Sequence, residues 1–320
     1  MISRRIIRIK VLQVLYAFNT SPDKSINNTE KELFFSIQKT YDLYHYLFQL
    51  AVEIANHANS VIELRKKKHF PTKDDLNPNT RFVNNLVVHQ IRTNSTLKKQ
   101  LEQSKLSWEN EPELIKKLYT ALVNADFYTA YMSAKDHSHQ DDKKLIEQLF
   151  AEIILQSEDL LYLLEEQSIY WNDDVDFVIS MIIKTLKKFK EYTGENQSLL
   201  PIFKDDEDRE FAKNLYRKTV VNHSELKKIV EEHTVNWDIE RIACIDTLIL
   251  ELAIAEFLYF PSIPTKVTLN EYIELSKYYS TQKSRNFING ILDKALKALK
   301  KDNRIIKAGR GLIGEENLAE

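Results

Sequence analysis

Glycine is scarce in this sequence: five of 320 residues are glycine, and the first one is Gly194. Sheet-rich folds and phosphate-binding loops need glycine where the backbone takes a positive φ or closely approaches a ligand. Apolar residues instead recur at the three- and four-residue spacing of amphipathic helices. We therefore predict an all-α fold. The pattern predicts helices at about 4–18, 30–66, 80–92, 95–104, 112–132, 142–156, 158–168, 173–190, 206–222, 224–233, 238–258, 268–279 and 283–301.

Three tryptophans indicate an internal repeat. Trp108, Trp171 and Trp237 each lie eleven residues after a leucine, and the spacings between them are 63 and 66 residues. Each copy reads as helix, helix, tryptophan, helix, with the ring at a corner between helices. This pattern predicts an array of stacked helical repeats with one continuous core, although a helical protein can produce part of it by chance.

Basic residues concentrate at the two ends of the chain, although the formal net charge is -2. Residues 1–22 contain four basic side chains and no acidic one, and residues 283–310 contain nine basic side chains against two acidic ones. This asymmetry indicates a local anionic partner.

The first helix combines arginines with an aromatic ring. Steps of 100° per residue place Arg4, Arg5 and Arg8 within one sector, and Tyr16 projects close to Arg5 three turns later. Guanidinium groups bind phosphate and aromatic rings stack on unpaired bases, so the pattern suits RNA. A solvated helix face is the alternative.

Segments at both ends resemble the NusB family of bacterial transcription antitermination factors. The match covers about residues 3–20 and 206–300, in the family's order. It is carried by Ser3-Arg4-Arg5-Ile6-Ile7-Arg8, Leu12-Gln13-Val14-Leu15-Tyr16, Lys266-Val267-Thr268-Leu269-Asn270-Glu271, Glu274-Leu275, Lys277 and Phe287-Ile288-Asn289-Gly290-Ile291-Leu292-Asp293-Lys294.

The resemblance implies an all-α, NusB-like helical bundle and four parts for this chain. These are N-terminal helices over 1–68, an inserted helical repeat region over 69–205, a NusB-like bundle over 206–301 and a flexible tail over 302–320. Residues from about 25 to 205 depart from the family, because they far exceed the short link that it usually has there.

The resemblance also implies binding to the boxA element of ribosomal RNA transcripts, together with the ribosomal protein NusE and the elongating RNA polymerase. It matches Arg4, Arg5, Arg8, Tyr16, Tyr279 and Phe287 to the RNA surface, and Glu256 to the NusE interface. Lys283 stands where the family commonly has an acid. Lys283 and Arg285 add cations next to Tyr279, and we expect them to attract phosphate.

Two other functions stay open. One is a helical scaffold that binds proteins through its repeats. The other is the RNA-binding domain of a ribosomal RNA methyltransferase, although only about twenty residues follow the domain here. We expect no catalysis, no cofactor, no metal and no membrane insertion, and we expect the cytoplasm as the compartment.

Three local patterns have simpler interpretations. The motif from Thr268 to Glu271 fits a capping box at a helix start. Residues 137–142 contain two histidines and two aspartates, which could suggest a metal, but they read as a polar link. The basic run from Arg65 to His69 fits a solvated helix end, where cations suit the helix dipole.

Overall fold

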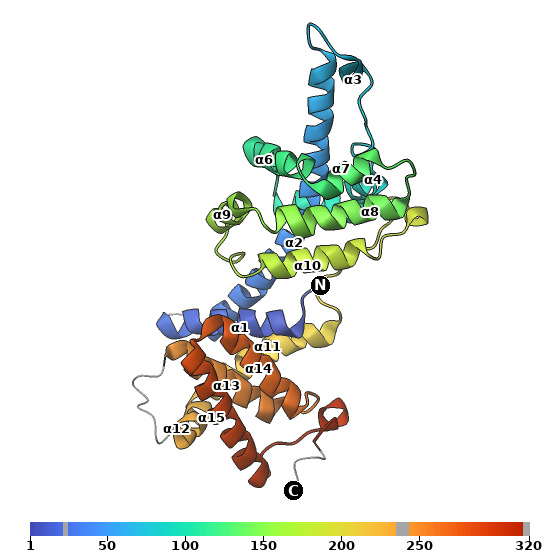
Figure 1. The fold of residues 1–320 in the computed structure, drawn as a ribbon. Coiled ribbons are helices and arrows are strands. Elements are labelled where there is room, and N and C mark those ends of the chain that lie inside the picture. Colours follow the sequence, from blue (N-terminus) through green and yellow to red (C-terminus); the bar gives the residue numbers. More distant parts are fainter. Residues whose placement is uncertain (22–24, 235–242, 316–320) are drawn as a thin grey trace. The chain divides into compact units, whose positions relative to one another are not determined.

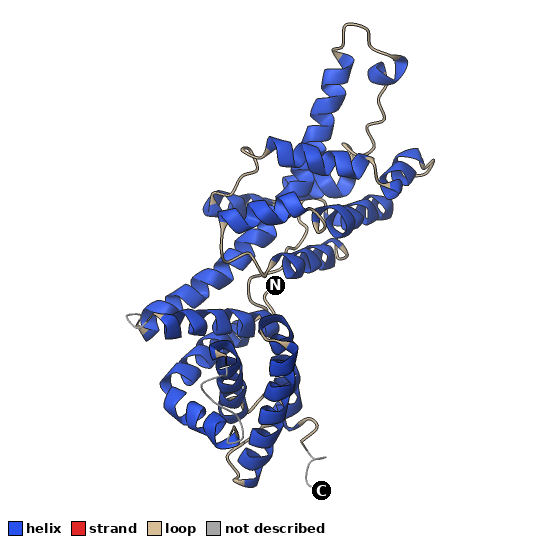
Figure 2. Cartoon of the chain, turned by 60° about the vertical axis from the view of Figure 1, so that its left-hand side comes forward, coloured by secondary structure: helices blue, strands red, loops and turns tan. Residues whose placement is uncertain are grey.

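A computed structural model describes residues 1–21, 25–234 and 243–315. These residues form fifteen α-helices, one π-helical turn, two short 3-10 turns and no strand, which confirms the predicted all-α class (Figure 2). None of the described helices is long and apolar enough to cross a membrane. The helices are α1 (Arg4–Thr20), α2 (Ile26–Lys66), α3 (Lys73–Leu76), α4 (Leu86–Thr93), α5 (Ser95–Ser104), α6 (Pro112–Val123), α7 (Asp126–Ser133), α8 (His139–Gln148), α9 (Glu158–Gln167), α10 (Val175–Leu186), α11 (Asp206–Val221), α12 (His223–His233), α13 (Cys244–Tyr259), α14 (Thr265–Tyr279) and α15 (Gln282–Lys301).

The chain forms two compact units. Unit 1 contains Met1 and residues 38–202, and unit 2 contains residues 2–37 and 203–320. The predicted division at 68/69 falls elsewhere in the structure, because α2 is one uninterrupted helix of 41 residues that contributes to both units. No glycine or proline interrupts α2, so the sequence holds no signal at the boundary near residue 37.

Tryptophan rings join two loops of unit 1 to the same helix. The Trp108 indole donates a hydrogen bond to the Tyr46 carbonyl oxygen at 2.9 Å, and the Trp171 indole donates one to the Lys39 carbonyl oxygen at 2.8 Å. The two acceptors are seven residues apart on α2, and therefore lie on one face. Both tryptophans follow a pair of helices and precede a third, as the repeat predicts. Trp237 lies outside the described residues, and the repeat stays a prediction.

The centre of unit 2 is α13. Its residues from Leu248 to Phe257 are all buried, because α1, α11, α12, α14 and α15 pack around it (Figure 1). Two of these buried residues, Glu251 and Glu256, are acidic. Glu251 accepts a hydrogen bond from His223 Nδ1 at 2.8 Å, and the partners of Glu256 lie on α1 and α14.

The start of α14 differs from the predicted capping box. The helix begins one turn earlier, at Thr265, after Pro264. Thr268 is buried and its hydroxyl donates to Glu256 at 2.8 Å, while Glu271 binds an arginine of α1. Both side chains of the predicted box therefore make tertiary contacts instead of capping the helix.

The predicted flexible tail is docked onto α14 and the preceding turn in its described part, 302–315. Glu315 accepts hydrogen bonds from the Thr265 backbone N–H at 2.8 Å and hydroxyl at 2.6 Å, and thereby caps α14. The Ala308 N–H donates to the Pro261 carbonyl oxygen at 3.0 Å. A Cβ on Gly311 would lie 1.9 Å from that oxygen, so only glycine allows this close approach.

Candidate functional site

Two helices from opposite ends of the chain run parallel in unit 2. The Arg5 guanidinium donates to Glu271 at 2.8 and 3.0 Å, and the Gln13 amide donates to the Tyr279 hydroxyl at 3.2 Å. Both pairs are separated by 266 residues, so eight residues along α1 correspond to eight residues along α14. The structure therefore brings the opening helix together with Tyr279, as the predicted site requires.

These helices and the start of α15 present cations and rings to solvent. We call the set Arg5, Tyr16, Tyr278, Tyr279 and Lys283 the α1–α14 surface. Tyr16 is 45% exposed and lies one turn beyond Gln13, Tyr278 is 75% exposed, and Lys283 is also exposed. Tyr279 is half-buried. Neither α1 nor α15 has an acidic residue in its first turn, so their positive dipole ends add to the cationic potential.

The Arg5–Glu271 pair lies at the edge of this surface. The hydrogen bond from Arg5 lowers the pKa of the Glu271 carboxyl, and it does so against partial burial, which would raise it. The guanidinium remains half-exposed, and its own pKa is raised by the same hydrogen bond. An exposed ion pair contributes about 0.2–1 kcal/mol, so a phosphate can replace Glu271 at low cost.

Arg4 projects toward α11. Its Nε donates to Asp208 on α11 at 2.8 Å, and its guanidinium lies 5.2 Å from the centre of the Phe211 ring. Arg4 is only partly exposed, and Glu207 is 3.6 Å from its head group. Two acids therefore already neutralise this predicted RNA contact.

Arg8 is not on the surface, in contrast to the prediction. Its side chain is 3% exposed and donates to Glu256 at 2.6 and 2.8 Å. Burial by itself would lower the pKa of Arg8, but the charge of Glu256 and these hydrogen bonds raise it. Lys10 is buried as well. Two of the four cations of the basic N-terminus thus lie inside unit 2.

Glu256 is completely buried, so a protein partner cannot reach the side chain that was predicted to bind it. Besides Arg8, the carboxylate accepts hydrogen bonds from the hydroxyls of Thr268 at 2.8 Å and Tyr272 at 3.2 Å. Burial, and then the charge of Glu256, raise the pKa of Tyr272 well above its usual value. Glu256 therefore holds α1 and α14 together in the core of unit 2 and thereby positions the α1–α14 surface.

The first turns of α15 contain the last two predicted residues. Arg285 is half-buried, and its Nε is buried without a hydrogen-bond partner among the described residues. Phe287 is buried with 9% of its surface exposed, so its ring offers little surface for base stacking. Of the three predicted residues on α15, Lys283 is exposed, whereas Arg285 is half-buried and Phe287 is buried.

Sequence reasoning missed Tyr278, the most exposed ring of the α1–α14 surface. It follows Glu271 by seven residues, which is about two helical turns, and it therefore projects from the same face of α14 as the partner of Arg5. That spacing was a signal in the sequence, but it gains meaning only when Glu271 is known to bind Arg5.

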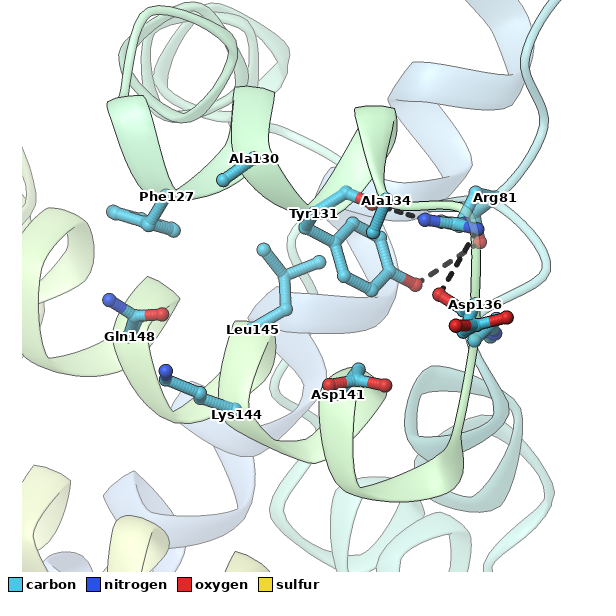
Figure 3. A pocket seen from close by; sticks show the side chains of 11 residues that line it. Arg81, Phe127, Ala130, Tyr131, Ala134, Asp136, Asp141, Lys144, Leu145 and Gln148 are labelled. Carbon is cyan, nitrogen blue, oxygen red and sulfur yellow. Dashed lines mark hydrogen bonds between the residues drawn. The ribbon is translucent and has the colours of Figure 1, made fainter.

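Two residues of the segment 137–142, His137 and Asp141, line an open pocket in unit 1. The segment is not a polar link throughout, because α8 begins at His139 and Asp142 is fully buried. Asp142 accepts hydrogen bonds from Tyr131 at 2.6 Å and binds His137 at 2.8 Å. The pocket has a volume of about 260 Å³, and Arg81 and Lys144 are among the side chains that line it (Figure 3). The described residues contain no cluster of ligands suited to a metal ion.

Comparisons with known proteins identify the class of this helical protein. The model of the NusB family matches residues 178–297, which begins inside α10 and ends inside α15. A transcription antitermination protein NusB from Salinibacter ruber is 39% identical over 145 residues, covering 43% of this chain and 91% of that protein. The match to a NusB from Chloroherpeton thalassium has 38% identity over 109 residues, 34% of this chain and 52% of the relative.

A third relative, a NusB from Oleidesulfovibrio alaskensis, is 51% identical over 89 residues, which is 28% of this chain and 58% of that protein. No solved structure matches the chain. The fold and the comparisons together define an all-helical protein of the transcription antitermination class. The chain belongs to the NusB family. The match starts at residue 178, so it includes part of the region predicted as an insertion.

Proposed function

We propose that this protein is an RNA-binding transcription antitermination factor that acts by binding and performs no catalysis. One observation carries the proposal: the parallel pairing of α1 with α14 aligns Arg5 and Tyr16 with Tyr278 and Tyr279 on one accessible face. Family membership adds the process, because the curated relatives are named transcription antitermination proteins.

Electrostatic capture and base stacking are the two steps of the proposed mechanism. Lys283 and Arg5 attract the phosphates of a single strand, and Arg5 exchanges Glu271 for a phosphate oxygen. Unpaired bases then stack on the exposed rings of Tyr16 and Tyr278, with Tyr279 between them at the helix interface. Stacking on an aromatic side chain contributes about 1–3 kcal/mol per base, and each phosphate contact adds about 0.7 to the salt slope of binding.

We further propose that the RNA is a boxA-type element of ribosomal transcripts and that the ribosomal protein NusE and the elongating RNA polymerase are partners. The buried position of Glu256 gives it an indirect role: it holds α1 against α14, and exposed residues of unit 2 make the partner contact. Cytoplasmic residence follows from this proposed role.

A fluorescence anisotropy titration with labelled boxA-type RNA tests the proposed surface. Arg5→Glu reverses one exposed charge and leaves Glu271 with a like-charged neighbour, so we expect weaker binding and a flatter dependence on salt. Lys297→Glu makes the same change of charge at an exposed position of α15, where the cation pairs with Asp293. The proposal is contradicted if Arg5→Glu binds as wild type does, or if both variants weaken binding equally.

Co-purification tests the proposed partners separately. Tagged full-length protein is incubated with purified NusE, with and without boxA-type RNA, and the retained NusE is quantified. We expect retention that increases with RNA, and failure to retain NusE in either condition would remove that partner while leaving the RNA assignment intact.

A further inference from the structure

The end of α2 forms a basic and aromatic tip on unit 1. In Figure 1, the last turns of α2 and the short helix α3 extend away from the remaining helices of that unit. Every residue from 63 to 70 is exposed. Residues 64–73 contain five basic side chains and no acidic one. These are Arg65, Lys66, Lys67, Lys68 and Lys73.

Hydrogen bonds order the tip although it buries little apolar surface. Lys68 Nζ donates to both carboxylate oxygens of Asp75, at 3.0 and 3.1 Å, and so closes the loop onto α3. Thr72 and Asp75 form a reciprocal capping box at the start of α3. The Phe70 ring is 84% exposed and meets His69 edge-on, with 4.5 Å between the ring centres. An ordered loop thus holds an exposed ring.

A solvated helix end explains only part of this arrangement. Cations in the last turn of a helix interact favourably with its dipole, which accounts for Arg65 and Lys66. The helix dipole does not account for Lys67 and Lys73, which lie beyond the end of α2. Within the described chain, Arg65, Lys67 and Lys73 form no salt bridge. It also does not account for Phe70, whose exposure to water is unfavourable.

We propose that this tip is a second contact for single-stranded RNA, in which Arg65, Lys67 and Lys73 bind phosphates and Phe70 stacks on a base. Cations next to an exposed ring are the combination that captures single strands without sequence preference. The proposal rests on the proposed function, because a factor that already holds a transcript brings RNA to its other cationic surfaces. An anionic membrane is the competing partner for such a tip and is one outcome of the test.

The experiment compares three variants of the full-length chain. The tip variant carries Arg65→Gln, Lys67→Gln and Phe70→Ala. The control carries Lys98→Gln and Lys99→Gln, which remove two exposed cations of α5 in the same unit. The third variant is Arg5→Glu. Binding of a labelled 30-nucleotide RNA is titrated between about 50 and 300 mM salt, a range in which phosphate contacts dominate the affinity. Sedimentation with phosphatidylcholine–phosphatidylserine vesicles is measured in parallel.

The tip variant is expected to bind RNA at least about five-fold more weakly, from the lost stacking, with a salt slope lower by about 1.4 for two lost phosphate contacts. The α5 control is expected to bind as wild type does. Because the exchanged side chains are exposed, hydrogen exchange across α2 should be unchanged, which shows that unit 1 remains folded.

Each other outcome has a definite meaning. Wild-type RNA binding by the tip variant overturns the inference, and so does vesicle binding that depends on the tip while RNA binding does not. If Arg5→Glu loses RNA binding but the tip variant does not, the proposed function stands and the tip is rejected as an RNA contact. If the tip variant loses RNA binding but Arg5→Glu does not, the tip remains an RNA contact and the α1–α14 surface is rejected as one. A wild-type protein that binds no RNA removes both.

Discussion

Replacing Arg8 by methionine should destabilise unit 2 severely, and by far more than the same change at Arg5. Methionine approximates the length of the arginine stem but leaves the Glu256 carboxylate buried without its cation. Removing one partner of a buried ion pair costs about 3–5 kcal/mol. Arg8 and Glu256 are 3% and 0% exposed, so water cannot replace the lost hydrogen bonds. The half-exposed Arg5–Glu271 pair should contribute only about 0.2–1 kcal/mol.

Hydrogen exchange measured by mass spectrometry gives the opening free energy of each unit separately. We expect the slowest amides of α13 to lose about 3–5 kcal/mol of protection in Arg8→Met, and less than about 1 kcal/mol in Arg5→Met. Amides of α10 in unit 1 provide the internal control and should not change. Equal and small losses of α13 protection in the two variants would refute the view that Arg8 is a buried structural residue.

A double variant identifies the cause of the loss. In Arg8→Met with Glu256→Gln neither member of the pair carries a charge. Thr268 and Tyr272 donate to different oxygens of Glu256, so in the glutamine variant the amide oxygen accepts from one hydroxyl and the amide NH2 donates to the other. We expect most of the lost stability to return, because neutral replacements of buried ion pairs are often close to neutral in effect. A double variant as unstable as Arg8→Met would mean that packing around the guanidinium, and not the orphaned carboxylate, dominates.

Two further predictions concern α14. Gly311→Ala should release the docked tail, because the new methyl group overlaps the Pro261 carbonyl oxygen. Overpacking of this kind costs about 1–3 kcal/mol. Release of the tail should be measurable as faster amide exchange in the first turn of α14. Arg5 lowers the pKa of Glu271, so this pair's contribution to stability is complete above the ordinary carboxyl pKa of 4.5 and is lost as the pH falls through the lower folded value. Arg5→Met should therefore flatten the acid side of the stability profile, as urea titrations between about pH 5 and 3 would show, and an unchanged profile would contradict the pairing.

Much of the fold could be read from the sequence because helices leave a local signal. The scarcity of glycine and the helical periodicity predict the all-α class, and the starts of α1, α5 and α6 coincide with the predicted ones. The unit boundary could not be predicted, since α2 runs through it without a break. The docking of Glu315 onto α14 joins residues 50 positions apart and likewise has no local signal.

The candidate site was predictable in outline but not residue by residue. Helical geometry places Arg5 and Arg8 in one sector, yet it cannot tell which of the two faces a buried acid. The difference arises from Glu256, on a helix almost 250 residues away, which draws Arg8 into the core and leaves Arg5 half-exposed. Family resemblance selected Tyr279, whereas the more exposed Tyr278 became visible only in the structure.

Photo-crosslinking with mass spectrometry tests the α1–α14 surface most directly. A boxA-type RNA with 4-thiouridine at successive positions is bound to the wild-type protein, irradiated and digested, and the modified residues are identified. We predict adducts on Tyr16 and on Tyr278 or Tyr279, in peptides from both ends of the chain. Efficient crosslinking that never reaches either peptide would contradict the account.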